Sequence, residues 1–143
     1  MTTAINFDGY STDDNRPVGI DVATREFIRA FFRSAAQEQF PCVCPTDSAL
    51  ALFRQYAKEE RMDPERCIGT NQNDADALEQ AGHLFRYDPG ILKHIWTRRQ
   101  FGQRRYSVSG LVHASSTDSV MDTVGQYVTA PTQSWDALIC PSN

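Results

Sequence analysis

The sequence lacks a long apolar run, and about 20 consecutive apolar residues are needed to span a membrane as a helix. It also lacks the basic start and apolar core of a secretory signal peptide, because its first residues are polar and acidic. These two absences predict a cytoplasmic protein with no membrane-spanning segment. In a reducing compartment the four cysteines are expected to be thiols rather than a disulfide framework: Cys42, Cys44, Cys67 and Cys140.

The sequence also has no excess of basic side chains. The 14 basic and 18 acidic side chains give a net charge of −4, which argues against nucleic acid as a partner of the whole domain. The length of 143 residues predicts a single domain, residues 1–143, and the apolar content of 41% is sufficient for a core.

The common nucleotide-binding motifs are absent. There is neither the GxGxxG run of dinucleotide-binding domains nor the GxxxxGK[ST] run of phosphate-binding loops. A zinc site made by Cys42, Cys44, Cys67 and His83 is conceivable, but the sequence has no second cysteine pair. Buried thiols in a core are the favoured interpretation, so no metal site is predicted.

Strand-like and helical segments alternate along the chain. This alternation predicts right-handed crossovers and a mainly parallel sheet covered by helices on both faces, a Rossmann-like three-layer α/β domain. The expected strands are 4–7, 40–44, 65–69, 83–87, 106–112 and 135–140, and the expected helices are 22–36, 49–61, 73–81, 90–100 and 120–128. The last two strands are expected to be parallel neighbours or near neighbours in the sheet.

Several helix ends are predicted from local signals. Thr46 or Asp47 is expected to cap the second helix, Asp88 to cap the fourth, and Gly82 to end the third. The first helix is expected to have an apolar face formed by Phe27, Ile28, Phe31 and Phe32.

The stretch from Tyr106 to Cys140 carries the best candidate site. Its first strand contains Gly110, where a strand tolerates glycine best if another backbone or a ligand comes close. His113 follows at the carboxyl end of this strand, where ligands bind in open parallel sheets. Ser115 and Ser116 then begin a helix with free N–H groups, and a neutral His113 imidazole beside it can hydrogen-bond a substrate hydroxyl or a phosphate oxygen. The alternative is a structural role, which is the usual one for a lone histidine.

Other polar residues have more ordinary interpretations. His83 and His94 lie at a strand start and on a helix, where a structural role is the default. A basic run stands at the end of the helix 90–100 and in the following turn. A solvated helix terminus is favoured over an anion or phosphate contact for its four members: Arg98, Arg99, Arg104 and Arg105.

Several stretches resemble the N-terminal domain of bacterial glycosyltransferases of the GT-B fold, in the retaining, glycogen-synthase-like group. The most specific is SVSGLVHASSTDSVMDTVGQYVTAPTQSWDALICPS, which contains the Ser-x-x-Gly-x-x-His strand end and the later Trp-Asp-Ala-x-Ile-Cys-like strand of that family. The upstream runs PVGIDVATREFIRAFFR and LFRYDPGILKHIWTRRQFG are similar to the first helix and to the strand and helix before the histidine. The resemblance extends from about Val18 to Ser142.

This resemblance implies a function and a set of site residues. The chain is expected to be the acceptor-side N-terminal domain of an enzyme that moves a sugar from a nucleotide-sugar donor to a glycan or other acceptor. It implies that His113 is the catalytic-centre histidine that contacts the donor sugar. Gly19, in the loop before the first long helix, together with Ser115 and Ser116, is expected to lie at the donor phosphates. An acid close behind Gly19, Asp21, departs from what a diphosphate prefers, although it can serve as a helix cap.

No cofactor is expected beyond the nucleotide-sugar substrate. The family's C-terminal domain, which holds most of the donor contacts, has no counterpart here, so the domain is expected to be incomplete and the chain alone inactive. The alternative is a stand-alone α/β ligand-binding or interaction domain without catalysis of its own.

Overall fold

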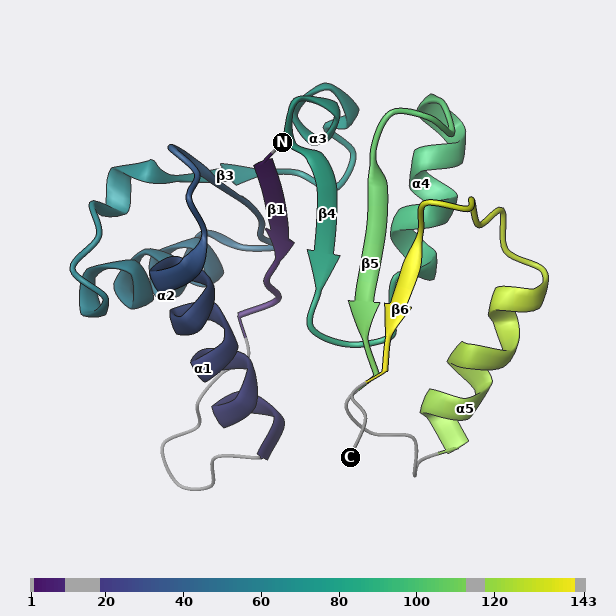
Figure 1. The fold of residues 1–143 in the computed structure, drawn as a ribbon, viewed down its shortest axis with the longest axis horizontal. Helices are drawn as coiled ribbons and strands as arrows, with labels where there is room; N and C mark the ends of the chain where they lie inside the picture. The colour runs from purple at the N-terminus through teal and green to yellow at the C-terminus, as the bar shows by residue number, and fades with distance from the viewer. Residues whose placement is uncertain (1, 10–18, 113–117, 141–143) are drawn as a thin grey trace. The chain divides into compact units, whose positions relative to one another are not determined.

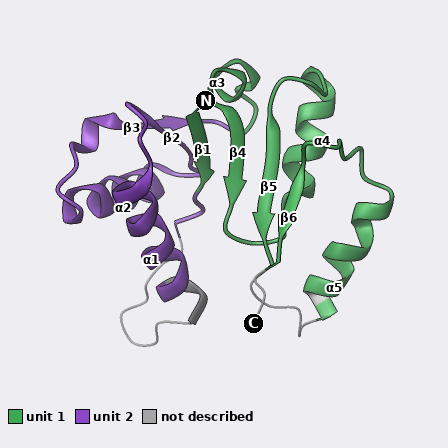
Figure 2. Cartoon of the chain, viewed as in Figure 1, with its two compact units in different colours: residues 1–6, 72–143 green, residues 7–71 purple. Residues whose placement is uncertain are grey.

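The computed structural model describes residues 2–9, 19–112 and 118–140, and strands and helices alternate as the sequence predicts. Six strands in this part of the chain form a parallel sheet in the order β3-β2-β1-β4-β5-β6 (Figure 1). This order is the one found in doubly wound Rossmann-type folds, and it confirms the predicted fold class. The chain consists of two compact units, residues 1–6 with 72–143 and residues 7–71 (Figure 2).

The first unit contains four parallel strands, which pair in the order β1-β4-β5-β6. The predicted pairing of the last two strands is confirmed, because β5 and β6 are parallel neighbours with Ser109 opposite Ala137. The elements of this unit are β1 (Thr2–Asn6), α3 (Ala75–Ala81), β4 (Gly82–Arg86), α4 (Leu92–Phe101), β5 (Ser107–Leu111), α5 (Asp118–Gly125), the 3-10 turn η2 (Gln126–Val128) and β6 (Ala137–Ile139).

Apolar side chains on the central strands and on α4 make the core of this unit. Leu84 of β4, Val108 of β5 and Ile95 of α4 are each fully buried. Gly82 ends α3 with a left-handed φ of 82°, a conformation that glycine adopts without the cost of a Cβ atom. The predicted helix stop at Gly82 is therefore confirmed, and the chain enters β4 directly.

The second unit consists of α1 (Gly19–Ser34), β2 (Phe40–Val43), α2 (Asp47–Glu59), the 3-10 turn η1 (Pro64–Arg66) and β3 (Cys67–Thr70). The strands β2 and β3 pair in parallel. Of the two predicted caps for α2, Thr46 is the N-cap, since its hydroxyl accepts from the backbone N–H of Ala49 at 3.2 Å.

Aromatic rings fill the interior of the second unit. The Phe32 ring lies 4.9 Å from Phe53 and 5.2 Å from Phe40, measured between centroids, and Phe7 lies 5.6 Å from Phe53. These tilted and edge-on contacts are the geometry that aromatic pairs prefer. The apolar face predicted for the first long helix therefore contributes to a packed core.

Two predicted helix starts differ from the structure. The helix α1 begins at Gly19, so this glycine is the first helical residue rather than part of a preceding loop. The helix α4 begins at Leu92, later than predicted, because Asp88 does not cap it. The Asp88 carboxylate instead accepts from the backbone N–H of Gly90 and from the Arg86 guanidinium, each at 2.6 Å, and so stabilises a turn before the helix.

In the part of the chain that the structure describes, no helix combines the length and the apolar character needed to cross a membrane.

Candidate functional site

The carboxyl ends of β4 and β5 form the edge at which the sequence places the candidate site. The strand β5 ends at Leu111, and the backbone N–H of the next residue, Val112, donates to the carbonyl of Ile139 in β6 at 2.9 Å. The side chains of His113, Ser115 and Ser116 lie outside the described residues, and their predicted roles stay predictions.

Gly110 is the described residue that shapes this edge. A Cβ atom at this position would lie 2.6 Å from the carbonyl oxygen of Asp88 and 2.7 Å from the Cγ2 atom of Ile91. Non-bonded carbon and oxygen atoms do not approach so closely, so only glycine fits. The expectation that another backbone or a ligand comes close to Gly110 is confirmed, and the close neighbour is backbone.

The loop between β4 and α4 is held in place over Gly110 by polar contacts. Besides the Asp88 contacts described above, the hydroxyl of Tyr127 in η2 donates to the carbonyl of Pro89. Burial raises the pKa of Tyr127 to about 12, so this hydroxyl stays protonated and can donate at physiological pH. The β4–α4 loop is thus held in place within the first unit.

Gly19 belongs to the second unit, at the start of α1. Its predicted phosphate-binding role stays a prediction.

His83 and His94 both have structural surroundings, in agreement with their interpretation from sequence. The His83 ring lies between two hydroxyls, with Nδ1 3.3 Å from Thr3 Oγ1 and Nε2 2.8 Å from Ser109 Oγ. Burial lowers the pKa of His83, and the nearby Asp136 carboxylate opposes this shift. His94 is buried in α4.

The cysteines are free thiols, with Cys42 and Cys67 buried and Cys140 exposed. The Sγ atoms of Cys42 and Cys44 lie 2.8 Å apart. Burial, together with the Cys44 contact, raises the pKa of Cys42, which makes it a poor nucleophile. Among the described residues no group of histidine, cysteine and carboxylate side chains is suited to hold a metal ion.

The solvated interpretation of the basic run is wrong for Arg98. This side chain is fully buried, and its NH1 and NH2 atoms each donate to a carboxylate oxygen of Asp136 at 2.6 Å. NH1 also donates to the carbonyl of Tyr106 at 2.9 Å. A guanidinium can be buried when it is paired in this bidentate way, and Arg98 has that partner 38 residues further along the chain.

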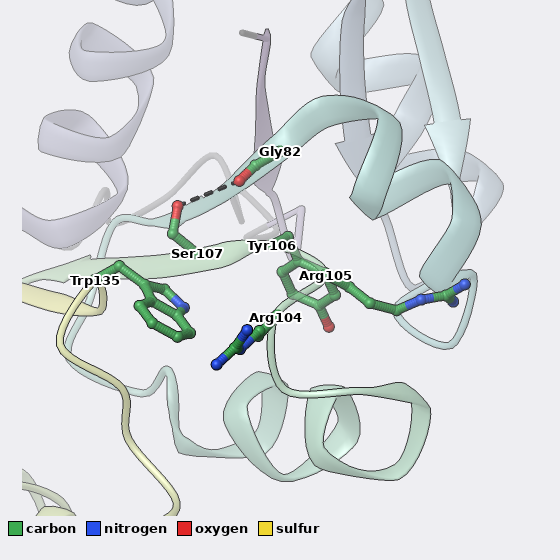
Figure 3. A pocket seen from close by; sticks show the side chains of 6 residues that line it. All are labelled: Gly82, Arg104, Arg105, Tyr106, Ser107 and Trp135. Carbon is green, nitrogen blue, oxygen red and sulfur yellow. Dashed lines mark hydrogen bonds between the residues drawn. The ribbon is translucent and has the colours of Figure 1, made fainter.

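A pocket of about 420 Å³ lies at the opposite, amino-terminal edge of the same sheet. Gly82 and Ser107 are the first residues of β4 and β5, and Trp135 precedes β6. Figure 3 shows the lining residues: Gly82, Arg104, Arg105, Tyr106, Ser107 and Trp135.

Sequence reasoning missed this pocket because its wall comes from three separate segments. One signal was available: no acidic residue occurs between Asp88 and Asp118, although five basic residues do. Such a local excess of positive charge within an acidic chain indicates a surface that attracts anions.

The fold defines a Rossmann-like α/β protein with a candidate site at the carboxyl edge of its first unit and a pocket at the amino edge. Comparison of the chain with protein-family models, with curated proteins and with solved structures gave no match.

Proposed function

We propose that the chain is the acceptor-side, N-terminal domain of a glycosyltransferase that moves a sugar from a nucleotide-sugar donor to an acceptor. One observation carries the proposal. The Ser107-x-x-Gly110 part of the predicted Ser-x-x-Gly-x-x-His pattern lies on β5, which ends at Leu111 at the carboxyl edge of a parallel sheet. Ligands of open parallel sheets bind outside this edge.

The described surroundings of position 113 support this role. The Asp88 contacts hold the β4–α4 loop beside Gly110, so this part of the sheet edge is pre-formed in the absence of a ligand. A pre-formed wall lowers the entropic cost of orienting a substrate. In the proposed mechanism His113 contacts the donor sugar, and the backbone at Gly19, Ser115 and Ser116 approaches the donor phosphates.

Weak donor binding can be tested by saturation-transfer NMR on the whole chain, with a panel of uridine, guanosine and adenosine diphosphate sugars. We expect saturation to reach the sugar protons of at least one donor. His113→Ala should reduce this signal severalfold, because it removes the contact to the sugar.

The control is Arg99→Gln, an exposed position near the end of α4 that lines neither the pocket nor the carboxyl edge of the sheet, and it should leave the sugar signal unchanged. The proposal would be contradicted if no donor in the panel received saturation from the protein. It would also be contradicted if His113→Ala left the sugar signal unchanged.

A binding domain without catalysis is the second candidate. The observation that favours it is the pocket at the amino ends of β4 and β5, because the proposed transfer reaction makes no use of that edge.

A further inference from the structure

We propose that the pocket at the amino edge of the first unit binds a small phosphorylated molecule with a flat ring, of the class of a nucleoside monophosphate. This site does not depend on the proposed glycosyl transfer, which concerns the opposite edge of the sheet. The argument rests on two features of the pocket wall: an uncommitted cation and an exposed aromatic face.

The cation is Arg104. Its neighbour Arg105 pairs with Asp76 at 2.9 Å and with Glu79 at 3.0 Å, and Arg98 is committed to Asp136. Within the described ranges, no carboxylate pairs with Arg104, and its side chain is exposed. Figure 3 shows Arg105 extending away from Trp135, so Arg104 is the charge that faces the open side of the pocket. Guanidinium groups recognise phosphate through a fork of N–H donors.

The aromatic face belongs to Trp135, whose side chain is 44% exposed. Large aromatic rings are usually buried, and an indole in a pocket wall offers a surface on which a flat ring can stack. In Figure 3 the indole of Trp135 and the guanidinium of Arg104 lie on the same side of the pocket. A ligand that carries both a ring and an anion can therefore use both side chains at once.

Tyr106 closes the wall behind these two side chains. The residue is 3% exposed, and the centroid of its ring lies 6.0 Å from the Arg98 guanidinium. The pocket therefore offers a ligand two recognition groups, the Arg104 guanidinium and the Trp135 indole.

The size of the pocket sets the size of the ligand. Small-molecule pockets usually enclose about 300–1,000 Å³, and 420 Å³ lies at the lower end of that range. Inorganic phosphate would leave most of this space empty. The wall is also fixed from behind, since Ser107 Oγ donates to the carbonyl of Gly82 at 3.2 Å and joins the starts of β5 and β4.

The test uses tryptophan fluorescence. The chain has two tryptophans, so Trp96→Phe leaves Trp135 as the only reporter. Adenosine monophosphate, adenosine and inorganic phosphate serve as probes. We expect adenosine monophosphate to quench Trp135 saturably, and we expect each of the other two to bind at least about tenfold more weakly, because each lacks one half of the recognised chemistry.

Two variants in the Trp96→Phe background identify the anion contact. Arg104→Gln should weaken the binding of adenosine monophosphate about tenfold and leave the binding of adenosine unchanged. Arg99→Gln is the matched control: Arg99 is exposed on the neighbouring helix, where it stacks 5.4 Å from the Trp96 ring, and it does not line the pocket.

Three results would overturn the proposal. They are quenching that does not saturate, equal affinities for adenosine and adenosine monophosphate, and an equal loss of affinity for adenosine monophosphate in Arg104→Gln and Arg99→Gln. A fourth variant separates this site from the proposed transfer site. His113→Ala should leave the affinity for adenosine monophosphate unchanged, and a loss as large as that of Arg104→Gln would place the ligand at the carboxyl edge and refute the pocket.

Discussion

Gly110 shows how one residue determines the shape of the candidate site. The carbonyl of Asp88 occupies the space in which any other residue would have its Cβ atom. The backbone of β5 therefore allows the β4–α4 loop to approach the strand just before it leaves the sheet. The position of the β4–α4 loop depends on the absence of a side chain at 110.

Gly110→Ala should lower the free energy of unfolding by about 1–3 kcal/mol, because the added methyl group meets backbone and a packed side chain rather than open space. Gly125→Ala is the matched control. At Gly125 a Cβ atom would meet nothing within 4 Å, and the residue ends α5 in a helical conformation. This change should stabilise the protein slightly, since alanine has the higher helix propensity. Urea unfolding measures both, and equal effects of the two changes would show that Gly110 is not closely packed.

His83 is a second residue whose surroundings determine its chemistry. Its ring is held between hydroxyls of Thr3 and Ser109, and burial disfavours its charged form. We expect an NMR titration of the ring to give a pKa below the ordinary value of 6.5. The urea-unfolded protein, in which burial is lost, supplies the reference value. A folded pKa equal to or above the unfolded one would contradict the burial of this ring.

The sign of the resulting pH dependence is determined by the direction of the shift. A lowered pKa means that the unfolded state binds more protons than the folded state just below pH 6.5. The contribution of His83 to stability is therefore full above that pH. This contribution is lost as the pH falls from 6.5 through the pKa of His83 in the folded protein. His83→Asn should flatten this part of the stability curve.

At the scale of elements, one buried ion pair joins three segments of the first unit. Arg98 on α4 binds Asp136, which lies just before β6, and also the carbonyl before β5. Asp136 in turn accepts from the backbone N–H groups of Val108 at 3.0 Å and Gln133 at 2.9 Å. The pair therefore positions the start of β6 and the segment that carries Trp135.

Arg98→Met should lower the free energy of unfolding by about 3–5 kcal/mol, because it leaves the Asp136 carboxylate buried without its counter-charge. Arg99→Met, at an exposed position on the same helix, should change it by no more than about 0.5 kcal/mol. The double change Arg98→Met with Asp136→Asn should be less destabilising than Arg98→Met alone, since it removes the unpaired charge. Urea unfolding of the four proteins tests this, and equal stability of Arg98→Met and Arg99→Met would disprove the role of the pair.

These elements also show what local sequence can and cannot predict. The stop at Gly82 and the cap at Thr46 were predictable because the residues that form them lie within a few positions of one another. The start of α4 was not, because Asp88 can cap a helix or a turn with the same carboxylate. The burial of Arg98 was not predictable either, since its partner is distant in the sequence and a run of arginines usually indicates a solvated surface.

At the scale of the whole molecule, alternation of strand and helix was sufficient for the fold class and for the parallel pairing of β5 with β6. Sites were harder to predict because they form where separate segments meet. His113 was predicted from one strand end, which a local pattern reveals. The pocket at the other edge needs Arg104, Ser107 and Trp135 together, and only the sheet order brings these three residues to one place.

The four cysteines differ in burial, and their reactivity tests the packing of the second unit, which contains Cys42, Cys44 and Cys67. Cys140 is exposed, whereas Cys42 and Cys67 are fully buried, and burial raises the pKa of Cys67 to about 11. Alkylation requires an accessible thiolate, so iodoacetamide should modify Cys140 first and Cys42 and Cys67 only after unfolding. Mass spectrometry of digested protein identifies the modified residues. Without reductant, denatured protein should show four labelled cysteines, and Cys140→Ser should abolish the fastest step. Fewer than four labels would mean that some thiols are oxidised, and rapid native labelling of Cys42 or Cys67 would mean that the second unit is not packed around β2 and β3.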